Sequence, residues 1–176
     1  MKYILIAVVS ADGYIARYSG DLPSSWTSIE EKEKFKEDIS NCLWSVMGRK
    51  THELSFKANR KRIIFTRSIN NIVENKNHIY FNPTKNSWND MLNLMTPVSR
   101  ICILGGTKIY DYFLKKKMID DLFITIEPVK FVKGLKLFSN LNWSKFPNNF
   151  IKEGFKIKKE NIINTYGTKY IHFSKN

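Results

Sequence analysis

The chain has 176 residues, 43% of them hydrophobic, and its 29 lysines and arginines against 16 acidic residues give a net charge of +13. This length suits one compact domain, so we expect a single domain over residues 1–176. No run of about 18 apolar residues occurs, and no membrane span is predicted. The cations are scattered, which favours a solvated basic surface over a nucleic-acid partner. A basic nucleic-acid-binding domain is kept as a remote alternative, because cations alternate with aromatic residues over residues 150–159.

Apolar runs alternate with helical segments in the first three quarters of the chain. Residues 3–9 are continuously apolar and end in the turn-like Ser10-Ala11-Asp12-Gly13, which predicts a buried strand and not a signal peptide. A helix is expected over residues 29–41, with Thr27 or Ser28 as its cap. The later elements expected are strands at 43–47, 63–66, 78–81, 100–104 and 122–127 and helices at 86–95 and 108–116.

Strands take over after residue 127. Residues 150–158 and 162–173 predict two long antiparallel strands around a turn near Glu160-Asn161. The whole order predicts an α/β fold with a mainly parallel sheet and a C-terminal antiparallel hairpin.

Cys42 and Cys102 are far apart in the sequence, and both lie in apolar surroundings. We interpret them as buried thiols without a disulfide, which is typical of a reducing compartment. A cytoplasmic location is therefore expected.

Two apolar runs end in glycine where a nucleotide could be bound. The run Ile101–Leu104 is followed by Gly105-Gly106 and a helical pattern, and Val46-Met47 is followed by Gly48 and Arg49-Lys50-Thr51. A glycine lets an anion approach the main chain, and a following helix adds the positive end of its dipole. Two such turns indicate a dinucleotide held at two points.

A charged helix places Glu31 four residues before Phe35, on the same face. Burial of this carboxylate would suit it to proton transfer near neutral pH. It could equally be one of several first-turn acids that favour the helix dipole. The three histidines show no metal-ligand spacing, so no metal is expected.

Several motifs in a fixed order resemble the dihydrofolate reductase-like superfamily, over nearly the whole chain. This superfamily includes dihydrofolate reductases and the C-terminal reductase domain of the riboflavin-pathway deaminase–reductase. The resemblance implies a central, mostly parallel eight-stranded sheet flanked by helices, and NADPH as cofactor. The motifs are Ser10-Ala11-Asp12-Gly13-Tyr14-Ile15-Ala16, Trp26 with Phe35, Val46 to Thr51, Arg60 to Thr66, Leu104-Gly105-Gly106 with Tyr110, Ile119 to Thr125, and Gly134 with Phe138.

The resemblance implies roles at the substrate. Glu31 resembles the acid that anchors the pterin and assists protonation of its C=N bond, and Thr125 resembles the threonine that orients this acid. Arg60 aligns with the arginine that binds the glutamate carboxylate of folate, although it could equally be one cation of Arg60-Lys61-Arg62. The other substrate-binding positions implied are Ile6, Ala7, Val8, Trp26 and Phe35.

The resemblance also implies the cofactor site. Arg67 is placed to meet the 2′-phosphate, which would favour NADPH over NADH. The other positions implied are Ile15, Ala16, Gly48, Arg49, Lys50, Thr51, Thr66, Leu104, Gly105, Gly106, Thr107, Lys108, Ile109 and Tyr110.

The substrate that the resemblance leads us to expect is dihydrofolate, and the alternative is 5-amino-6-(5-phosphoribosylamino)uracil, the ribosylamino-pyrimidine of riboflavin biosynthesis. The form of Ser10 to Ala16 is closer to the riboflavin branch, Pro23 is separated from Trp26 by two serines, and Thr107 replaces a frequent third glycine. No zinc-deaminase signature occurs, so the chain would be a reductase alone. Relatives in the riboflavin branch pair, which makes a homodimer the oligomer to test.

Overall fold

A mixed sheet forms the centre of the computed structural model, which describes residues 1–175. The strands of this sheet are β1 (Lys2–Ser10), β3 (Trp44–Gly48), β4 (Lys61–Phe65), β5 (Val73–Asn75), β6 (His78–Phe81), β7 (Arg100–Ile103), β8 (Asp121–Glu127), β10 (Lys156–Ile162) and β11 (Lys169–Ser174). The helices are α1 (Ile29–Ser40), α2 (Arg49–Leu54), α3 (Trp88–Asn93), α4 (Thr107–Lys115) and α5 (Asn148–Lys152). Short 3-10 turns cover Pro23–Ser25 and Trp143–Lys145.

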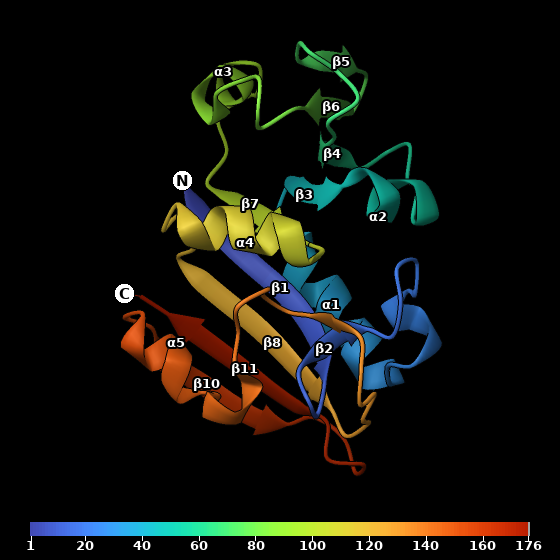
Figure 1. Cartoon of the computed structure of the whole chain (residues 1–176), viewed down its shortest axis with the longest axis vertical. Coiled ribbons are helices and arrows are strands. Elements are labelled where there is room, and N and C mark those ends of the chain that lie inside the picture. The colour runs from blue at the N-terminus through green and yellow to red at the C-terminus, as the bar shows by residue number, and fades with distance from the viewer. Residues whose placement is uncertain (176) are drawn as a thin grey trace.

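The strand order is β10-β11-β8-β1-β7-β3-β4-β6-β5. Figure 1 shows β1 running through the middle of the sheet, with β8 and β7 on its two sides. The strands from β8 to β6 are parallel neighbours, while β11, β10 and β5 are antiparallel. The α/β class, the mainly parallel sheet and the C-terminal hairpin are confirmed.

The sheet has nine strands in the described residues, where eight were expected. The strand missed by sequence reasoning is β5, which has three exposed residues at the edge of the sheet. A strand with no buried side chain leaves no apolar pattern to recognise. A second small sheet, β2 (Tyr14–Ala16) with β9 (Leu135–Lys136), was also missed, because strands of three and two residues are too short to show an alternating pattern.

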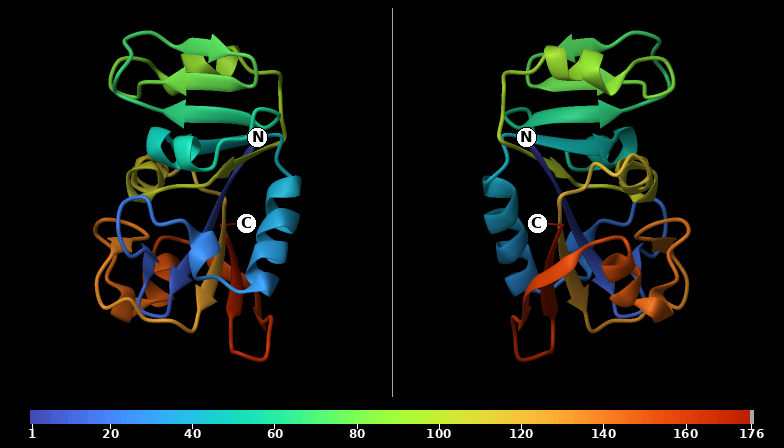
Figure 2. Two further views of the ribbon diagram at one scale, coloured as in Figure 1. Left: turned by 90° about the vertical axis from the view of Figure 1, so that its right-hand side faces the viewer. Right: turned by 90° about the vertical axis from the view of Figure 1, so that its left-hand side faces the viewer.

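The two faces of the sheet pack differently. Alternate residues of β1 point to opposite faces, so Tyr3 and Leu5 join a large apolar core with residues of α3, α4 and α5. Ile4 and Ile6 lie on the other face, in a small cluster against Ile39 of α1. Figure 2 shows α1 alone on its side of the central strands, with α4 and α5 on the opposite side.

The C-terminal region corrects the predicted element boundaries. Residues 148–152 are helical and not the start of a strand, and Gly154, with φ +90°, follows this helix in the left-handed conformation that glycine tolerates. The hairpin turn lies at residues 163–168 and not at Glu160-Asn161. There the Asn164 side-chain oxygen accepts from the backbone N–H groups of Tyr166 and Thr168. These hydrogen bonds from nearby backbone N–H groups to Asn164 stabilise the turn at residues 163–168, and Glu160-Asn161 makes no comparable turn.

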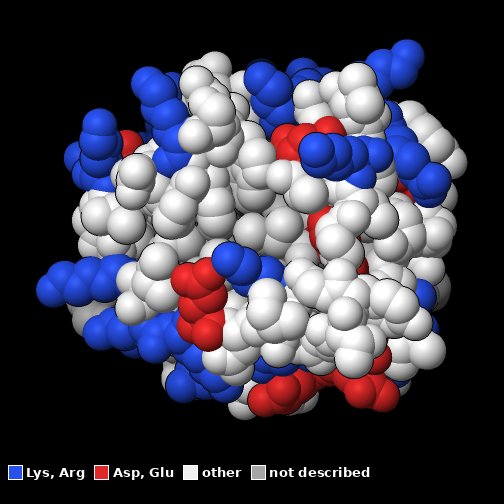
Figure 3. Space-filling view, turned by 90° about the horizontal axis from the view of Figure 1, so that it is seen from below, with Lys and Arg blue, Asp and Glu red and all other residues white. Residues whose placement is uncertain are grey.

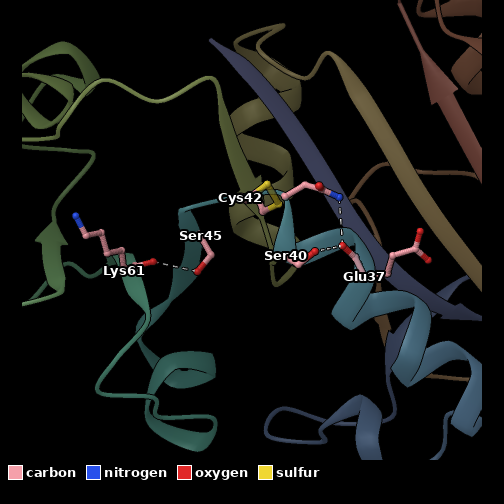
Figure 4. The surroundings of a disulfide bond; sticks show 7 residues. Glu37, Ser40, Cys42, Ser45 and Lys61 are labelled. Carbon is pink, nitrogen blue, oxygen red and sulfur yellow. Dashed lines mark hydrogen bonds between the residues drawn. A yellow bond between two sulfur atoms is a disulfide. The ribbon is translucent and has the colours of Figure 1, made fainter.

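Cys42 and Cys102 form a disulfide, which contradicts the expectation of two free thiols. Cys102 lies on β7 opposite Ser45 of β3, and Cys42 lies just before β3, so parallel pairing brings the two Cα atoms to 5.8 Å. Figure 4 shows Cys42 just beyond the end of α1, where the Ser40 hydroxyl donates to the Glu37 carbonyl. A separation of 60 residues hides this proximity in the sequence. Disulfides persist mainly in oxidising surroundings, so the bond removes the argument on which the cytoplasmic expectation rested.

No helix within residues 1–175 is long and apolar enough to span a bilayer. The same residues contain no group of three or more His, Cys, Asp or Glu side chains arranged to hold a metal ion.

Candidate active site

A cleft of about 1330 Å³ contains most of the predicted site residues. It opens at the carboxyl ends of the central parallel strands, where open α/β sheets commonly bind ligands. The predicted residues that line it are Ile6, Ala7, Val8, Ile15, Ala16, Glu31, Phe35, Gly48, Arg49, Lys50, Thr51, Arg60, Thr66, Arg67, Leu104, Gly106, Thr107, Lys108, Ile109 and Tyr110. Trp26, Thr125 and Gly105 are not part of the lining.

The two glycine turns meet at one edge of the cleft. The Gly48 N–H donates to the Gly105 carbonyl at 3.0 Å, so segments 57 residues apart in number form one surface. Gly48 and Gly106 are the N-caps of α2 and α4, and neither helix start is capped by a side chain. The first-turn N–H groups of both helices are therefore available to an anion.

Gly105 requires the absence of a side chain. Its φ is +95°, and a Cβ at this position would lie 2.7 Å from the Tyr110 ring. The Tyr110 Oη donates to the Ile6 carbonyl at 2.9 Å, and this fixes the ring between α4 and the central strand. The glycine turn therefore lies close to β1. The side chain of Ile15, which belongs to β2, also lies next to Gly106.

Cations surround the glycine turns. Arg49 pairs with Glu53 at 3.1 Å, and the Lys50 ammonium donates to Ser19. Arg67 is exposed and, within residues 1–175, forms no ion pair. Free helix N-termini, an accessible glycine surface and cations at the rim are the groups that a pyrophosphate and an additional phosphate need. The glycine turns and the cations around them fit nicotinamide adenine dinucleotide phosphate.

Glu31 is a buried acid at the other side of the cleft, with 5% of its surface exposed. Its backbone N–H donates to the hydroxyl of Ser28, the N-cap of α1, which confirms the second of the two caps expected. Burial raises the pKa of Glu31 to about 7, while the Thr27 hydroxyl lowers it and the charge of Glu127 raises it further. This carboxyl can hold or release a proton near neutral pH.

Two predicted residues lie beside the cleft in arrangements that sequence reasoning did not foresee. Thr125 is buried on β8, and its hydroxyl makes no hydrogen bond within the described residues, so the orienting bond to Glu31 stays a prediction. Trp26 packs edge-on against Phe131, with ring centres 4.9 Å apart. The Trp26 Nε1 is buried without a partner in the described part of the chain.

Further cations, which with Arg60 form a cationic rim at the substrate side of the cleft, were not predicted, because Arg60 was the only cation expected to bind substrate. Lys32 and Lys36 of α1 and Lys57 of the loop after α2 also line the cleft. The periodicity of α1 could have found the first two, because Lys32 and Lys36 are four residues apart and therefore lie on one face of the helix. In Figure 3, basic side chains stand in separate places around one face of the molecule and do not merge into a single patch.

Comparisons with known proteins agree with this fold. Residues 3–175 match the family model described as "Dihydrofolate reductase". A dihydrofolate reductase of Candida albicans is 28% identical over 158 residues, which cover 77% of this chain and 76% of that protein.

Solved structures of both branches share the fold. A putative riboflavin biosynthesis protein from Shewanella sp. PV-4 superposes with a TM-score of 0.72 at 20% identity, over 100% of this chain and 99% of that one. The dihydrofolate reductase of Enterococcus faecalis, complexed with NADP(H) and RAB-propyl, gives 0.67 at 20% identity, over 99% and 96%.

The family match, together with this fold, places the chain among the reductases of the dihydrofolate reductase-like superfamily, which use a nicotinamide cofactor. Because the family model spans nearly the whole sequence, the chain belongs to the dihydrofolate reductase family.

Proposed function

We propose that this protein uses NADPH to reduce 7,8-dihydrofolate to tetrahydrofolate. The observation that carries the proposal is a buried acid, Glu31, in the same cleft as two uncapped glycine turns. Reduction of a C=N bond needs a hydride at carbon and a proton at nitrogen. NADPH, when bound, supplies the hydride, and the site must supply the proton and a dry, aligned setting.

Glu31 is suited to the proton. Its raised pKa keeps a large fraction of the carboxyl protonated at neutral pH, whereas an exposed glutamate would be ionised. A protonated carboxyl can donate to the imine nitrogen of the pterin, and its other oxygen can accept from the ring amine. Phe35, one helical turn further on, offers an aromatic surface to the substrate within the same cleft.

The cationic rim is suited to an anionic substrate tail. Arg60 is exposed and forms no ion pair within residues 1–175, so its guanidinium is open to a carboxylate. Lys32, Lys36 and Lys57 add positive charge to the same cleft. These groups match the glutamate carboxylates of a folate.

The second candidate substrate is 5-amino-6-(5-phosphoribosylamino)uracil. The fold similarity to the Shewanella riboflavin biosynthesis protein and the form of Ser10 to Ala16 support it. The same cationic rim would then bind a ribose phosphate.

Loss of reduced-nicotinamide absorbance with each substrate in turn tests the proposal. Turnover of dihydrofolate with NADPH, inhibited by an antifolate, is the expected result. Turnover of the ribosylamino-pyrimidine alone would assign the second function, and binding of NADPH without either turnover would reject both. The homodimer and the cytoplasmic location stay predictions, and the disulfide argues against the second of them.

A further inference from the structure

A second buried carboxylate, Glu127, lies at the end of β8 and has no place in the reaction described above. Only 3% of its surface is exposed. One carboxylate oxygen, Oε1, accepts from both the backbone N–H and the hydroxyl of Ser28, each at 2.7 Å. The other, Oε2, accepts from the Thr168 hydroxyl at 2.6 Å. Three hydrogen bonds hold this side chain in one orientation.

Ser28 connects Glu127 directly to the proposed proton donor. Its hydroxyl donates to Glu127 and accepts from the backbone N–H of Glu31 at 3.2 Å. Since Ser28 is the N-cap of α1, the carboxylate of Glu127 also lies at the positive end of that helix. The first turn of α1, which carries Glu31, is thereby bound to the end of β8.

The contact extends to the C-terminal hairpin. Asn164, in the turn between β10 and β11, donates to both the Thr168 hydroxyl and the Glu30 carboxylate. Glu127 therefore joins three segments far apart in the sequence: the start of α1, the end of β8 and the hairpin turn. An ordinary helix cap needs none of these additional bonds.

We propose that Glu127 is a positioning residue for Glu31: it fixes the first turn of α1 through Ser28, and it presents a negative charge to the proton-donating carboxyl. The inference rests on the proposed role of Glu31 in reduction. A buried negative charge near a carboxyl favours the protonated form of that carboxyl.

The charges that act on Glu31 come from two elements. Glu127 of β8 and Asp38 of α1 raise the pKa of Glu31, and Lys32 of α1 lowers it, in addition to burial and the Thr27 hydroxyl. Asp38 is hydrogen-bonded to Lys34 at 2.8 Å, which offsets its charge, whereas Glu127 has only neutral donors. Of the two carboxylates that raise the pKa of Glu31, Glu127 is therefore the one whose charge is not offset by a hydrogen-bonded cation.

The decisive variant is Glu127→Gln, which keeps the size of the side chain and removes its charge. The matched control is Glu33→Gln, which removes the same charge from an exposed position of α1.

We expect the pH at which kcat falls to move down by roughly half a unit to one unit in Glu127→Gln, because Glu31 loses its proton more readily. NADPH affinity stays unchanged, and the control keeps the parent profile. Glu127→Asp, which retains the charge, restores most of the profile. A Glu127→Gln enzyme with the parent pH profile would overturn the proposal, even if its stability fell.

Two further measurements keep the inference separate from the proposed function. NMR titration of the Glu31 carboxyl carbon needs no substrate, and it should show the same downward shift in Glu127→Gln. A shift without any dihydrofolate turnover would sink the proposed substrate and leave the coupling standing; no shift would remove the coupling. If Glu127→Gln does not fold, Ser28→Ala removes the hydroxyl that links Glu127 to the Glu31 N–H, keeps the charge, and leaves only the backbone N–H bond from residue 28 to Glu127. We then expect a fall in kcat at an unchanged profile, and an unchanged kcat would overturn the bridge.

Discussion

The two faces of the sheet have different compositions and different tasks. The face under α3, α4 and α5 holds a continuous core of aromatic and aliphatic side chains. The face under α1 has a small apolar cluster of Ile4, Ile6 and the two cysteines, and its other buried groups include Glu31, Asp38 and Glu127. Burial of apolar surface stabilises the first face, whereas buried carboxylates on the second cost free energy unless they are paired. The contrast indicates that the face under α3, α4 and α5 supplies most of the stability, while the α1 face carries the buried acids, Glu31 among them, that lie at or near the cleft.

The largest expected effect breaks the stabilising face. Phe113 of α4 is fully buried among aromatic neighbours that include Tyr3 and Trp88. Phe113→Ala should lower the free energy of unfolding by about 3–5 kcal/mol, because it leaves a cavity. At temperatures where the variant is folded, its KM for substrate should match the parent. Urea unfolding and steady-state kinetics check this, and a large change in KM at unchanged stability would reverse the assignment of the two faces.

The next effect separates activity from stability on the α1 face. Glu31→Gln should slow turnover by about 100-fold to 1000-fold, because the proton donor is lost. The folded-state pKa of Glu31 is raised from 4.5 to about 7. The folded protein therefore holds more protons than the unfolded chain between these values, and stability falls as pH rises through this window.

The same variant should be more stable than the parent at pH 8, by roughly 2–3 kcal/mol, since glutamine has no charge to bury. Turnover and thermal unfolding at pH 5 and pH 8 check both statements, with Glu33→Gln as the exposed control. Equal stability of parent and Glu31→Gln at pH 8 would show that Glu31 is solvated in solution.

The disulfide tests what stabilises the α1 face, where both cysteines lie. It closes a loop of 60 residues between the end of α1 and β7. Replacing both Cys42 and Cys102 with alanine should lower the free energy of unfolding by about 2–4 kcal/mol relative to the oxidised protein. Thiol counting by mass spectrometry and denaturant unfolding check this. Two free thiols in freshly purified protein would restore the interpretation made from the sequence.

The smallest expected effect concerns the cofactor. Arg67→Ala should weaken NADPH by about tenfold and leave NADH nearly unchanged, because one charge-assisted contact to the 2′-phosphate is lost. Nucleotide fluorescence titration measures both, and Lys156→Ala on the exposed strand β10 serves as a control for net charge. Equal losses for the two nucleotides would remove Arg67 from cofactor selection.

Much of the cleft followed from local sequence signals. Gly48 and Gly105-Gly106 stand out because each ends an apolar strand before a helix, and both turns do lie at one edge of the cleft. Glu31 was identified with two interpretations open, and its burial supports the proposed role in proton transfer. Glu127 was not identified, although a carboxylate at the end of an apolar strand was visible. Its importance depends on Ser28, which is 99 residues away.

The sequence by itself determined the α/β class, the order of the main strands and helices, and the two glycine turns, because these depend on periodicity and on residues a few positions apart. Only the tertiary structure decided the disulfide, the bonding of Glu127 to the start of α1, and the hairpin turn around Asn164. The disulfide and the Glu127 bonds are contacts between distant segments that leave no local pattern in the chain. Parallel pairing of β3 with β7 brings the cysteines together, and packing of the start of α1 and the hairpin turn against the end of β8 creates the Glu127 bonds. The raised pKa of Glu31 belongs to the same group, because burial is a property of the packed molecule and not of a residue.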